Sequence, residues 1–478
     1  MKAEVREPAL TRYVPGSLKP PCLTGISGWH PLLFHQAGPA HGRQGTSPMA
    51  DKPFLYSLDE CPPLWRTTIY GLQWALIMFP ALVIIASIGA EVLHLSVEER
   101  VAFFQKILLL SGGFTFLQTM IGHRYPLQEG PATALLLTFV VLAPQGLGVI
   151  QGGFLFGGLV LLAAGVFRWM RRLRSSFTPN VVGVILMLIA FTLVPFLLPR
   201  LLGVTAEHPH GEAGVFGAAL ALILLIAILA NRLGGFLRST AVILGIVIGS
   251  IGFWFWGRMD LRPVQEASWL SLPGSLWMGV PRFSLAALVS SGLAYVAVAV
   301  NSLGSIHGVG GVVGSEGIAE RVDRGLAVTG LAGVAASVLG VVGTVSYSTS
   351  PGVILVTRVA SRHAQAMCGL VLVIAAFVPR LSALLAAVPS TVVGSALCVA
   401  LGSQIGAGIT AITAGGRSLA ARDYLVVGLP VMIGTLVAVV PPAFFAKFPV
   451  WLGTILGNGL VLGIILVLIL EHALMRAK

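Results

Sequence analysis

Residues 341–363 read VVGTVSYSTSPGVILVTRVASRH, and this stretch decides the fold. A helix that crosses a bilayer needs about 20 consecutive apolar residues. Here a hydroxyl-rich run at residues 344–350 meets a Pro351-Gly352 break before a short apolar half at residues 353–356. Bare backbone amides and carbonyls cannot face lipid, so such a break is tolerated only where it is buried in protein or lines a cavity. The stretch therefore predicts a binding site within the membrane.

An earlier stretch has the same features. From Arg124 it reads RYPLQEGPATALLLTFVVLAP, where Pro126 and Gly130-Pro131 precede a short apolar half. Two short segments interrupted by glycine and proline, at matching places in two halves of a chain, indicate a secondary transporter built from inverted repeats. We expect both broken segments to contribute to one site.

The composition is that of a membrane protein. Hydrophobic residues make up 56% of the 478 residues and charged residues only 10%, and the mean hydropathy is +0.91. Soluble globular chains carry about 25% charged residues. The net charge of +12 comes from basic residues in short loops between apolar segments, a pattern typical of membrane topology rather than of nucleic-acid binding. The expected partner is the lipid bilayer, with no nucleic acid.

No motif supports enzyme or metal chemistry. The sequence contains no HExxH, no GxSxG and no P-loop. The four cysteines, Cys22, Cys61, Cys368 and Cys398, lack CxxC or metal-ligand spacing, and we interpret them as small packing residues. We therefore expect no enzyme activity, no catalytic residues, no cofactor and no metal.

Apolar segments divide the chain into two halves of seven. They are predicted at residues 68–90, 101–121, 130–143, 147–170, 179–198, 214–230 and 240–256, then from 285 to 300 and onward, 326–342, 345–356, 364–378, 391–412, 424–440 and 451–470. The predicted fold is an all-α membrane protein with fourteen transmembrane segments, of which the third and the tenth are broken. Residues 1–64 are expected to form a polar, disordered tail without the apolar core of a signal peptide, and Met49 is a second candidate start.

The loop charges predict an orientation. If the N-terminus is cytoplasmic, the inner loops carry fourteen arginines and lysines and the outer loops carry seven. Basic residues concentrate in cytoplasmic loops. The sequence thus predicts a multi-pass protein of the inner or plasma membrane with both termini in the cytoplasm.

Four motifs carry a resemblance to a known family. They are GLQW at residues 71–74, YPLQEGPATA at 125–134, YSTSPG at 347–352 followed by Thr357-Arg358, and ILGNGLVLG at 455–463. They resemble the GLQH-like, LPxxQGxSFAF-like and YSENxG motifs and the last helix of the nucleobase–ascorbate transporters, which include uracil and xanthine permeases.

The resemblance covers residues 65–471 and implies an architecture. It implies two inverted seven-segment repeats, with short strands and half-helices in segments 3 and 10 that pair near the midplane. A core domain, residues 65–170 and 283–388, would move against a gate domain, residues 171–282 and 389–478. Substrate would lie between the paired strands and segment 8. Relatives of this fold commonly form homodimers through the gate domain.

Departures from the family pattern bear on the chemistry. Proton-coupled members carry one glutamate on segment 8 and another in YSENxG, and the matching positions here are Asn301 and Thr349. The Asn of that motif is Ser350, and the His of the first motif is Trp74. An amide pairs with a base edge through one donor and one acceptor, and a hydroxyl can donate or accept. Neither side chain titrates.

Glu129 is the candidate for any coupling to protons. The other seventeen acidic residues fall in the tail, in loops or at segment ends. An ionisable group inside a membrane is a functional candidate by default. Two structural alternatives are a pairing with Arg124 and a cap on the half-helix that starts at Pro131. The predicted substrate-binding residues are Asn301, Ser305, Ser348, Thr349, Ser350, Glu129, Thr133, Gln73 and Trp74.

Three functions remain open from the sequence. The first is a secondary transporter that moves a nucleobase such as uracil or xanthine, or a similar small polar heterocycle, by alternating access. The second is a sulfate-type anion transporter or channel of the same architecture, in which half-helix N-termini hold the anion without a midplane acid. The third is a membrane scaffold or sensor that binds a ligand without moving it.

Overall fold

The computed structural model describes residues 54–169, 177–205, 207–234, 237–238, 240–276, 279–413, 418–445 and 447–475. These residues belong to one compact unit, Lys52–Lys478. The predicted disordered tail lies outside the described residues up to residue 53. Residues 54–63, the last part of that predicted tail, are held against the rest of the unit, since Tyr56 forms a parallel bridge with Val359.

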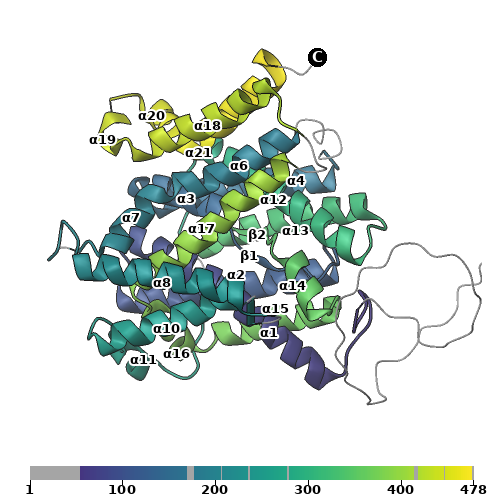
Figure 1. Cartoon of the computed structure of the whole chain (residues 1–478), viewed down its shortest axis with the longest axis vertical. Helices are drawn as coiled ribbons and strands as arrows, with labels where there is room; N and C mark the ends of the chain where they lie inside the picture. Colours follow the sequence, from purple (N-terminus) through teal and green to yellow (C-terminus); the bar gives the residue numbers. More distant parts are fainter. Residues whose placement is uncertain are drawn as a thin grey trace, which may run out of the picture. The chain divides into compact units, whose positions relative to one another are not determined.

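The described residues are mostly helical (Figure 1). The helices are α1 (Leu64–Val92), α2 (Val97–Met120), α3 (Thr133–Leu142), α4 (Leu147–Val166), α6 (Pro179–Thr192), α7 (Val194–Leu202), α8 (Ala213–Arg232), α10 (Ala241–Phe255), α11 (Arg262–Glu266), α12 (Leu285–Val313), α13 (Ile318–Leu339), α14 (Ser350–Thr357), α15 (Arg362–Ala376), α16 (Pro379–Ala386), α17 (Ser390–Ile412), α18 (Ala421–Val439), α19 (Pro442–Phe445), α20 (Val450–Leu456) and α21 (Gly459–Ile469). Two strands, β1 (Glu129–Pro131) and β2 (Thr344–Ser346), complete the set.

Helix length and composition identify a multi-pass membrane protein. Within the described ranges, nine helices are long and apolar enough to cross a bilayer, or ten if the bent pair α15 and α16 is one span. The bend of 90° falls at Pro379, which starts α16 and cannot continue the hydrogen bonding of α15. Shorter apolar helices occupy Thr133–Gln145, Ala241–Phe255 and Gly459–Leu474.

The two strands form an antiparallel ribbon among the helices. Glu129 pairs with Ser346, Gly130 with Val345, and Pro131 with Thr344, and all six residues are buried. Figure 1 shows the ribbon in the middle of the helical bundle. Both broken stretches thus change from strand to helix, because α3 follows β1 and α14 follows β2. Because the strands are antiparallel, α3 and α14 follow opposite ends of the ribbon.

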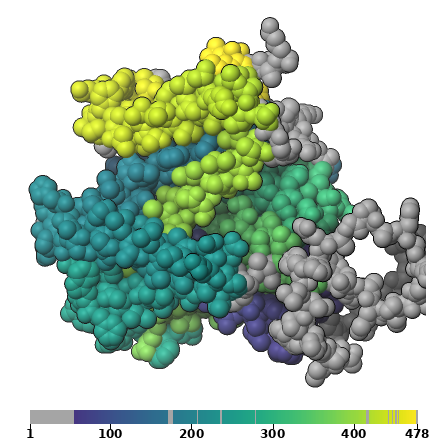
Figure 2. Space-filling view, in the orientation of Figure 1, coloured from purple at the N-terminus to yellow at the C-terminus, as the bar shows by residue number. Residues whose placement is uncertain are grey.

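Glycines allow two close helix pairs around the ribbon. A Cβ atom on Gly112 of α2 would lie 2.7 Å from the carbonyl oxygen of Gly369 in α15. A Cβ atom on Gly330 of α13 would lie 2.2 Å from the backbone nitrogen of Leu162 in α4. Only glycine permits this backbone approach, as is common where membrane helices pack. Figure 2 shows α17 between two groups of helices, α8 and α10 (teal) and α18–α21 (yellow).

Candidate functional site

Glu129 opens strand β1 and is fully buried. Its carboxylate accepts hydrogen bonds from the hydroxyls of Thr329 and Thr344, each at 3.0 Å, and of Ser346 at 2.8 Å. The amide nitrogen of Gln118 lies at 3.5 Å. Among the described residues no cation pairs with this carboxylate. The Glu129 carboxyl group is therefore surrounded by neutral groups from α2, α13 and β2, and these contacts involve neither Arg124 nor the start of the half-helix α3.

The same polar cluster fixes the ribbon to its neighbours. The Gln118 amide nitrogen also donates to the Gly325 carbonyl and the Thr329 hydroxyl, both at 2.9 Å, and so joins α2 to α13. One turn earlier on α2, the Thr115 hydroxyl accepts from the Glu129 backbone N–H at 3.1 Å. Sequence reasoning missed these partners. The available signal was that polar side chains recur at helical spacing within the apolar segment 101–121.

Helix α12 is fixed to the opposite strand. The Ser305 hydroxyl lies 2.9 Å from the Ser346 carbonyl oxygen and 2.8 Å from that of Asn301, and its single proton serves either acceptor. Ser302 accepts from the Ser346 backbone N–H at 3.4 Å. Ser346 thus contacts Glu129 through its side chain and α12 through its backbone. Asn301 is half-buried beside these contacts.

Helix α12 contacts α14, and Gly304 of α12 and Gly352 of α14 are both exposed. A Cβ atom on Gly304 or on Gly352 would meet no described atom within 4 Å outside its own helix. Ser348 and Thr349 are exposed in the turn before α14. Asn301 shares the helical face of Gly304, because residues three apart are neighbours on a helix surface. We call the exposed surface formed by Gly304, Ser348, Thr349 and Gly352 the recess.

The two half-helices present different residues at their starts. Thr349 is the N-cap of α14 and its side chain makes no capping bond. The next residue, Ser350, is fully buried, and its hydroxyl accepts from the Gln128 backbone N–H at 3.3 Å. Ser350 therefore ties α14 to the chain before β1. Thr133, the first residue of α3, is half-buried after Ala132, whose N–H donates to the Gly343 carbonyl at 2.8 Å.

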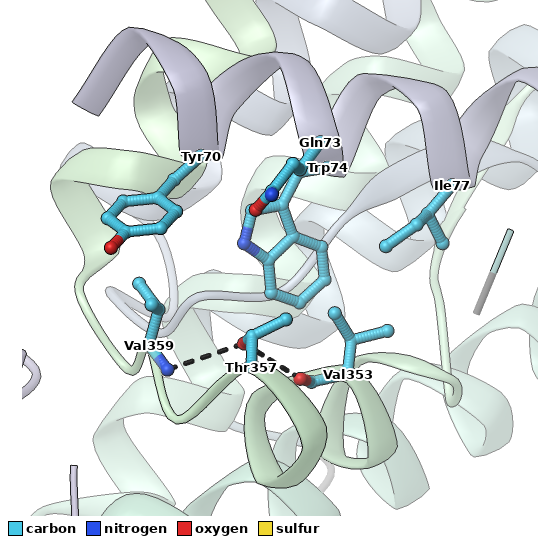
Figure 3. Close-up of a pocket in the computed structure, with 7 residues that line it drawn as sticks. All are labelled: Tyr70, Gln73, Trp74, Ile77, Val353, Thr357 and Val359. Atoms are coloured by element: carbon cyan, nitrogen blue, oxygen red, sulfur yellow. Dashed lines mark hydrogen bonds between the residues drawn. The ribbon is translucent and has the colours of Figure 1, made fainter. Parts of the chain in front are cut away.

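Figure 3 shows where the structure places the two predicted residues of α1. Gln73 and Trp74 point across a shallow pocket toward Val353 and Thr357 of α14. It leaves no room for a water molecule, and its lining is Tyr70, Gln73, Trp74, Ile77, Val353, Thr357 and Val359. Thr349, Val353 and Thr357 follow each other at spacings of four on α14, so Thr349 continues the same face toward the ribbon.

The indole of Trp74 packs in this pocket and is 2% exposed. The Trp74 carbonyl accepts from the side-chain amide of Gln128 at 2.6 Å, which fixes α1 beside β1. Tyr347, quoted in the sequence motif but given no role there, donates from its hydroxyl to the Pro131 carbonyl at 3.2 Å. Trp74 thus holds the residue before β1, and Tyr347, the residue after β2, holds the last residue of β1.

The structure thus groups seven of the nine predicted residues in three places, and Thr133 and Ser350 lie at the starts of α3 and α14. Asn301, Ser305, Ser348 and Thr349 lie by the recess or against β2, Gln73 and Trp74 line the pocket on α14, and Glu129 is enclosed behind the ribbon. A separate cavity of about 360 Å³ between α1, α10 and α16 has an almost wholly apolar lining in which Ser250 is the one polar side chain. Within the described ranges no group of three or more His, Cys, Asp or Glu residues could hold a metal.

Comparison with known proteins places these features in context. A family model described as a permease family, for xanthine and uracil permeases, matches residues 66–443. The nucleobase transporter PlUacP of Paenibacillus larvae is 29% identical over 408 residues, which cover 82% of this chain and 91% of that protein. The uric acid permease PucK of Bacillus subtilis is 26% identical over 416 residues, covering 85% and 95%.

Two solved structures have a similar fold. The transmembrane domain of the cyanobacterium bicarbonate transporter BicA superposes with a TM-score of 0.57 at 15% identity, over 78% of this chain and 95% of that chain. The murine anion transporter Slc26a9 gives a TM-score of 0.55 at 13% identity, over 84% and 67%. At such identities the likeness concerns the fold alone.

Proposed function

This chain belongs to the xanthine/uracil permease family, and on that premise we propose that it carries a nucleobase such as uracil or xanthine, or a similar small polar heterocycle, by alternating access. It is a permease and not an enzyme. The relatives named for nucleobase or uric acid transport align over most of its length, which supports this substrate class.

The span count supports a fourteen-segment architecture. The nine long helices, the bent pair, the three shorter apolar helices and α14 together supply the fourteen segments predicted from the sequence. Their order places the two strand-and-helix segments third in each half of seven. The excess of basic residues in alternate loops supports cytoplasmic termini.

The helix packing supports two inverted repeats. In such a fold, each segment of the first half corresponds to the segment seven places later. The contact of α2 with α15 joins segments 2 and 11, and that of α4 with α13 joins segments 9 and 4. Exchange of the halves converts one contact into the other. The pairing of β1 with β2, segments 3 and 10, maps onto itself.

The same contacts support a core and a gate. Helices α1–α4 and α12–α16 pack mainly with each other, as do α6–α10 with α17–α21. We propose that the first group moves as the core against the second. Transporters with this arrangement expose a midplane site alternately to the two sides of the membrane. We propose that the predicted homodimer forms through the gate, where α8 and α18 carry exposed apolar residues.

Recognition is assigned to the recess. The observation that carries this proposal is the exposed surface at Gly304 and Gly352, with Asn301 and Thr349 at its border. The Asn301 amide offers a donor and an acceptor to an amide-like base edge, and Thr349 offers a hydroxyl. Ser305 holds the Asn301 carbonyl, and Ser348 adds a second hydroxyl. Gln73 and Trp74 border the path along α14.

Any coupling to protons is assigned to Glu129. Its carboxylate has no cationic partner among the described residues, so a proton can neutralise it without breaking an ion pair. Protonation turns one acceptor oxygen into a donor and changes the bond from the Ser346 hydroxyl. The Ser346 backbone is bound by Ser302 and Ser305, next to Asn301. Strand β2 thus provides a mechanical link from Glu129 to the recess.

Uptake into proteoliposomes tests the function. Labelled uracil, xanthine and sulfate are offered with and without a pH gradient, and empty liposomes serve as the control. Saturable uptake of a nucleobase that unlabelled nucleobase competes away is the expected result. Uptake of sulfate alone would favour the anion transporter, and binding of a nucleobase without any uptake would favour a sensor.

A further inference from the structure

The first described residues, 54–60, form an extended segment that precedes α1. In this segment, FLYSLDE, the even-numbered residues are half-buried, whereas Leu55, Ser57 and Asp59 are exposed. A period of two is that of a strand with one side packed. Phe54 and Leu58 pack against the hydrophobic core. The segment is therefore held to the molecule by one of its faces, and we call residues 54–60 the strap.

The strap runs parallel to residues 358–361, which connect α14 to α15. The Leu55 N–H donates to the Arg358 carbonyl at 2.8 Å, and the Tyr56 carbonyl accepts from the Ala360 N–H at 3.0 Å. A third backbone bond, also of 3.0 Å, follows two residues further along both segments. An extended segment that adds to another in this way is bound mainly through main-chain hydrogen bonds.

Side chains from two helices also hold the strap. Arg362, the first residue of α15, forms an ion pair with Asp59 at 2.7 Å. Arg66 of α1 donates to the Tyr56 hydroxyl at 2.7 Å. The strap thus joins the starts of α1 and α15 to the connection that follows α14.

Helix α14 has few other constraints at its end. It contains only eight residues, and helices shorter than about 12 residues are marginal by themselves. It ends at Arg358, whose φ of 58° is a left-handed conformation that is unfavourable for a residue with a side chain. The strap binds the carbonyl of this same residue. Loss of the strap would therefore free the end of α14.

The recess lies at the other end of this helix. Thr349 is the N-cap of α14, and Gly352 lies in its first turn. Eight residues make a helix of about 12 Å, so a tilt at one end displaces the other. Val353 and Thr357 pack beside α1 in a pocket that leaves no room for a water molecule. By holding the end of α14, the strap keeps this pocket closed and the recess in its present shape.

We propose that the strap is a conformational switch that controls α14. While the strap is bound, α14 stays against α1, and its release frees α14 to move. Three backbone bonds and one exposed carboxylate hold the strap, so its local release costs far less than global unfolding. The consequence for nucleobase binding at the recess rests on the proposed function, whereas the hold of the strap on α14 does not.

Amide hydrogen exchange of the full chain in detergent, without any nucleobase, tests the switch. Leu55→Pro removes the N–H that donates to Arg358, and Leu55→Ala, which keeps this N–H, is the matched control. We expect exchange of residues 350–362 to quicken roughly tenfold in the proline variant alone, because local opening becomes cheaper. The other half-helix, α3, should exchange as before. Unchanged exchange of residues 350–362, or equal quickening in α3, would overturn the proposal.

A charge exchange provides a second, independent variant. Asp59→Lys should quicken exchange of residues 350–362, because it places two positive charges together at Arg362. Addition of Arg362→Asp should slow the exchange again, since the ion pair forms with reversed charges. Fast exchange that the second substitution leaves unaltered would contradict a specific attachment of the strap.

Nucleobase binding tests the consequence for the recess. We expect the Kd of Leu55→Pro to exceed that of Leu55→Ala by about threefold or more, because a freed α14 lowers the competent fraction. Faster exchange with equal Kd values would contradict control of the recess by the strap. Faster exchange in a chain that binds no nucleobase at all would contradict the proposed function and leave the hold of the strap on α14 confirmed.

Discussion

Asn301 provides the recess with a side chain that can both donate a hydrogen bond to a base edge and accept one from it. It is half-buried, beside the Ser302 and Ser305 contacts that hold β2. We expect Asn301→Ala to weaken nucleobase binding by about 1 to 3 kcal/mol, because the base would keep a donor and an acceptor without partners. Equilibrium binding of labelled base to purified protein measures this loss. Thr410→Ala on α17 is the control, and equal affinity in both variants would place the site elsewhere.

A substitution at Glu129 can test proton coupling while the hydrogen bonds around this residue are kept. Glu129→Gln keeps the size of the side chain, and the hydroxyls of Thr344 and Ser346 can reverse to accept from its amide. We expect uptake driven by a pH gradient to lose its dependence on the gradient, while base binding stays measurable. Comparison of uptake with and without the gradient gives the answer. Gradient dependence equal to that of the unaltered protein would remove Glu129 from the coupling mechanism.

The residues of the site were predictable only in part. Glu129 stood out because an acid within an apolar segment is rare, and the motif drew attention to Asn301 and Thr349. The donors around Glu129 could not be predicted, because Thr329 and Ser346 lie about 200 residues away in the chain. Trp74 was predicted to bind substrate, and the burial of its indole beside α14 could not be predicted from the sequence.

At the level of elements, close packing against strand β1 explains why it has a glycine, Gly130, between Glu129 and Pro131. A Cβ atom there would lie 2.5 Å from the Tyr347 hydroxyl oxygen and 2.6 Å from the terminal carbon of Met78. We expect Gly130→Ala to lower stability by about 1 to 3 kcal/mol through overpacking, measured as a lower Tm. Tyr347→Phe in the same chain should recover part of the loss. Gly113→Ala on α2, where no described atom lies within 4 Å, is the control and should leave Tm equal or higher.

Another pair of elements is joined outside the membrane by an ion pair. Arg258, after α10, donates to Glu212 before α8 at 2.6 and 2.7 Å, and this bond lowers the pKa of the Glu212 carboxyl. A lowered folded-state pKa gives stability that is present above the unfolded pKa and is lost as pH falls through the folded value. The Tm of Glu212→Gln should thus lie below that of the unaltered protein at neutral pH. The difference should shrink as pH falls below about 4.3, the pKa of an unfolded Glu, and vanish once Glu212 is protonated in the folded protein. Glu207→Gln, in the same loop, is the control, and a difference independent of pH would contradict the assignment.

Secondary-structure elements could be predicted from the sequence where proline or glycine constrains the backbone. Proline and glycine breaks located both strand-and-helix segments, since proline removes a backbone donor and glycine permits close approach. The register of β1 on β2 could not be predicted, because it depends on side chains from α2, α12 and α13. Residues 364–378 were predicted as an apolar segment, and α15 occupies most of it; the 90° bend into α16, which follows at Pro379, was not predicted.

At the scale of the whole molecule, Arg200 and Glu91 test whether core and gate move. Their ion pair at 2.5 Å joins α7 of the proposed gate to α1 of the proposed core. We replace both by cysteine in a chain whose four native cysteines are alanine, and treat it with a short bis-maleimide. Because alternating access requires α1 to shift against α7, the cross-linked protein should bind nucleobase but lose uptake.

The matched control lies within one proposed domain. Glu212 and Arg258 form an ion pair at 2.6 Å, and both belong to the proposed gate. Cysteines at these two positions should cross-link equally well, and uptake should persist because no movement separates the two residues. Loss of uptake in both cross-linked proteins would mean that the reagent damages the protein. Full uptake with α1 tied to α7 would show that these helices move together, and the division into core and gate would have to be redrawn.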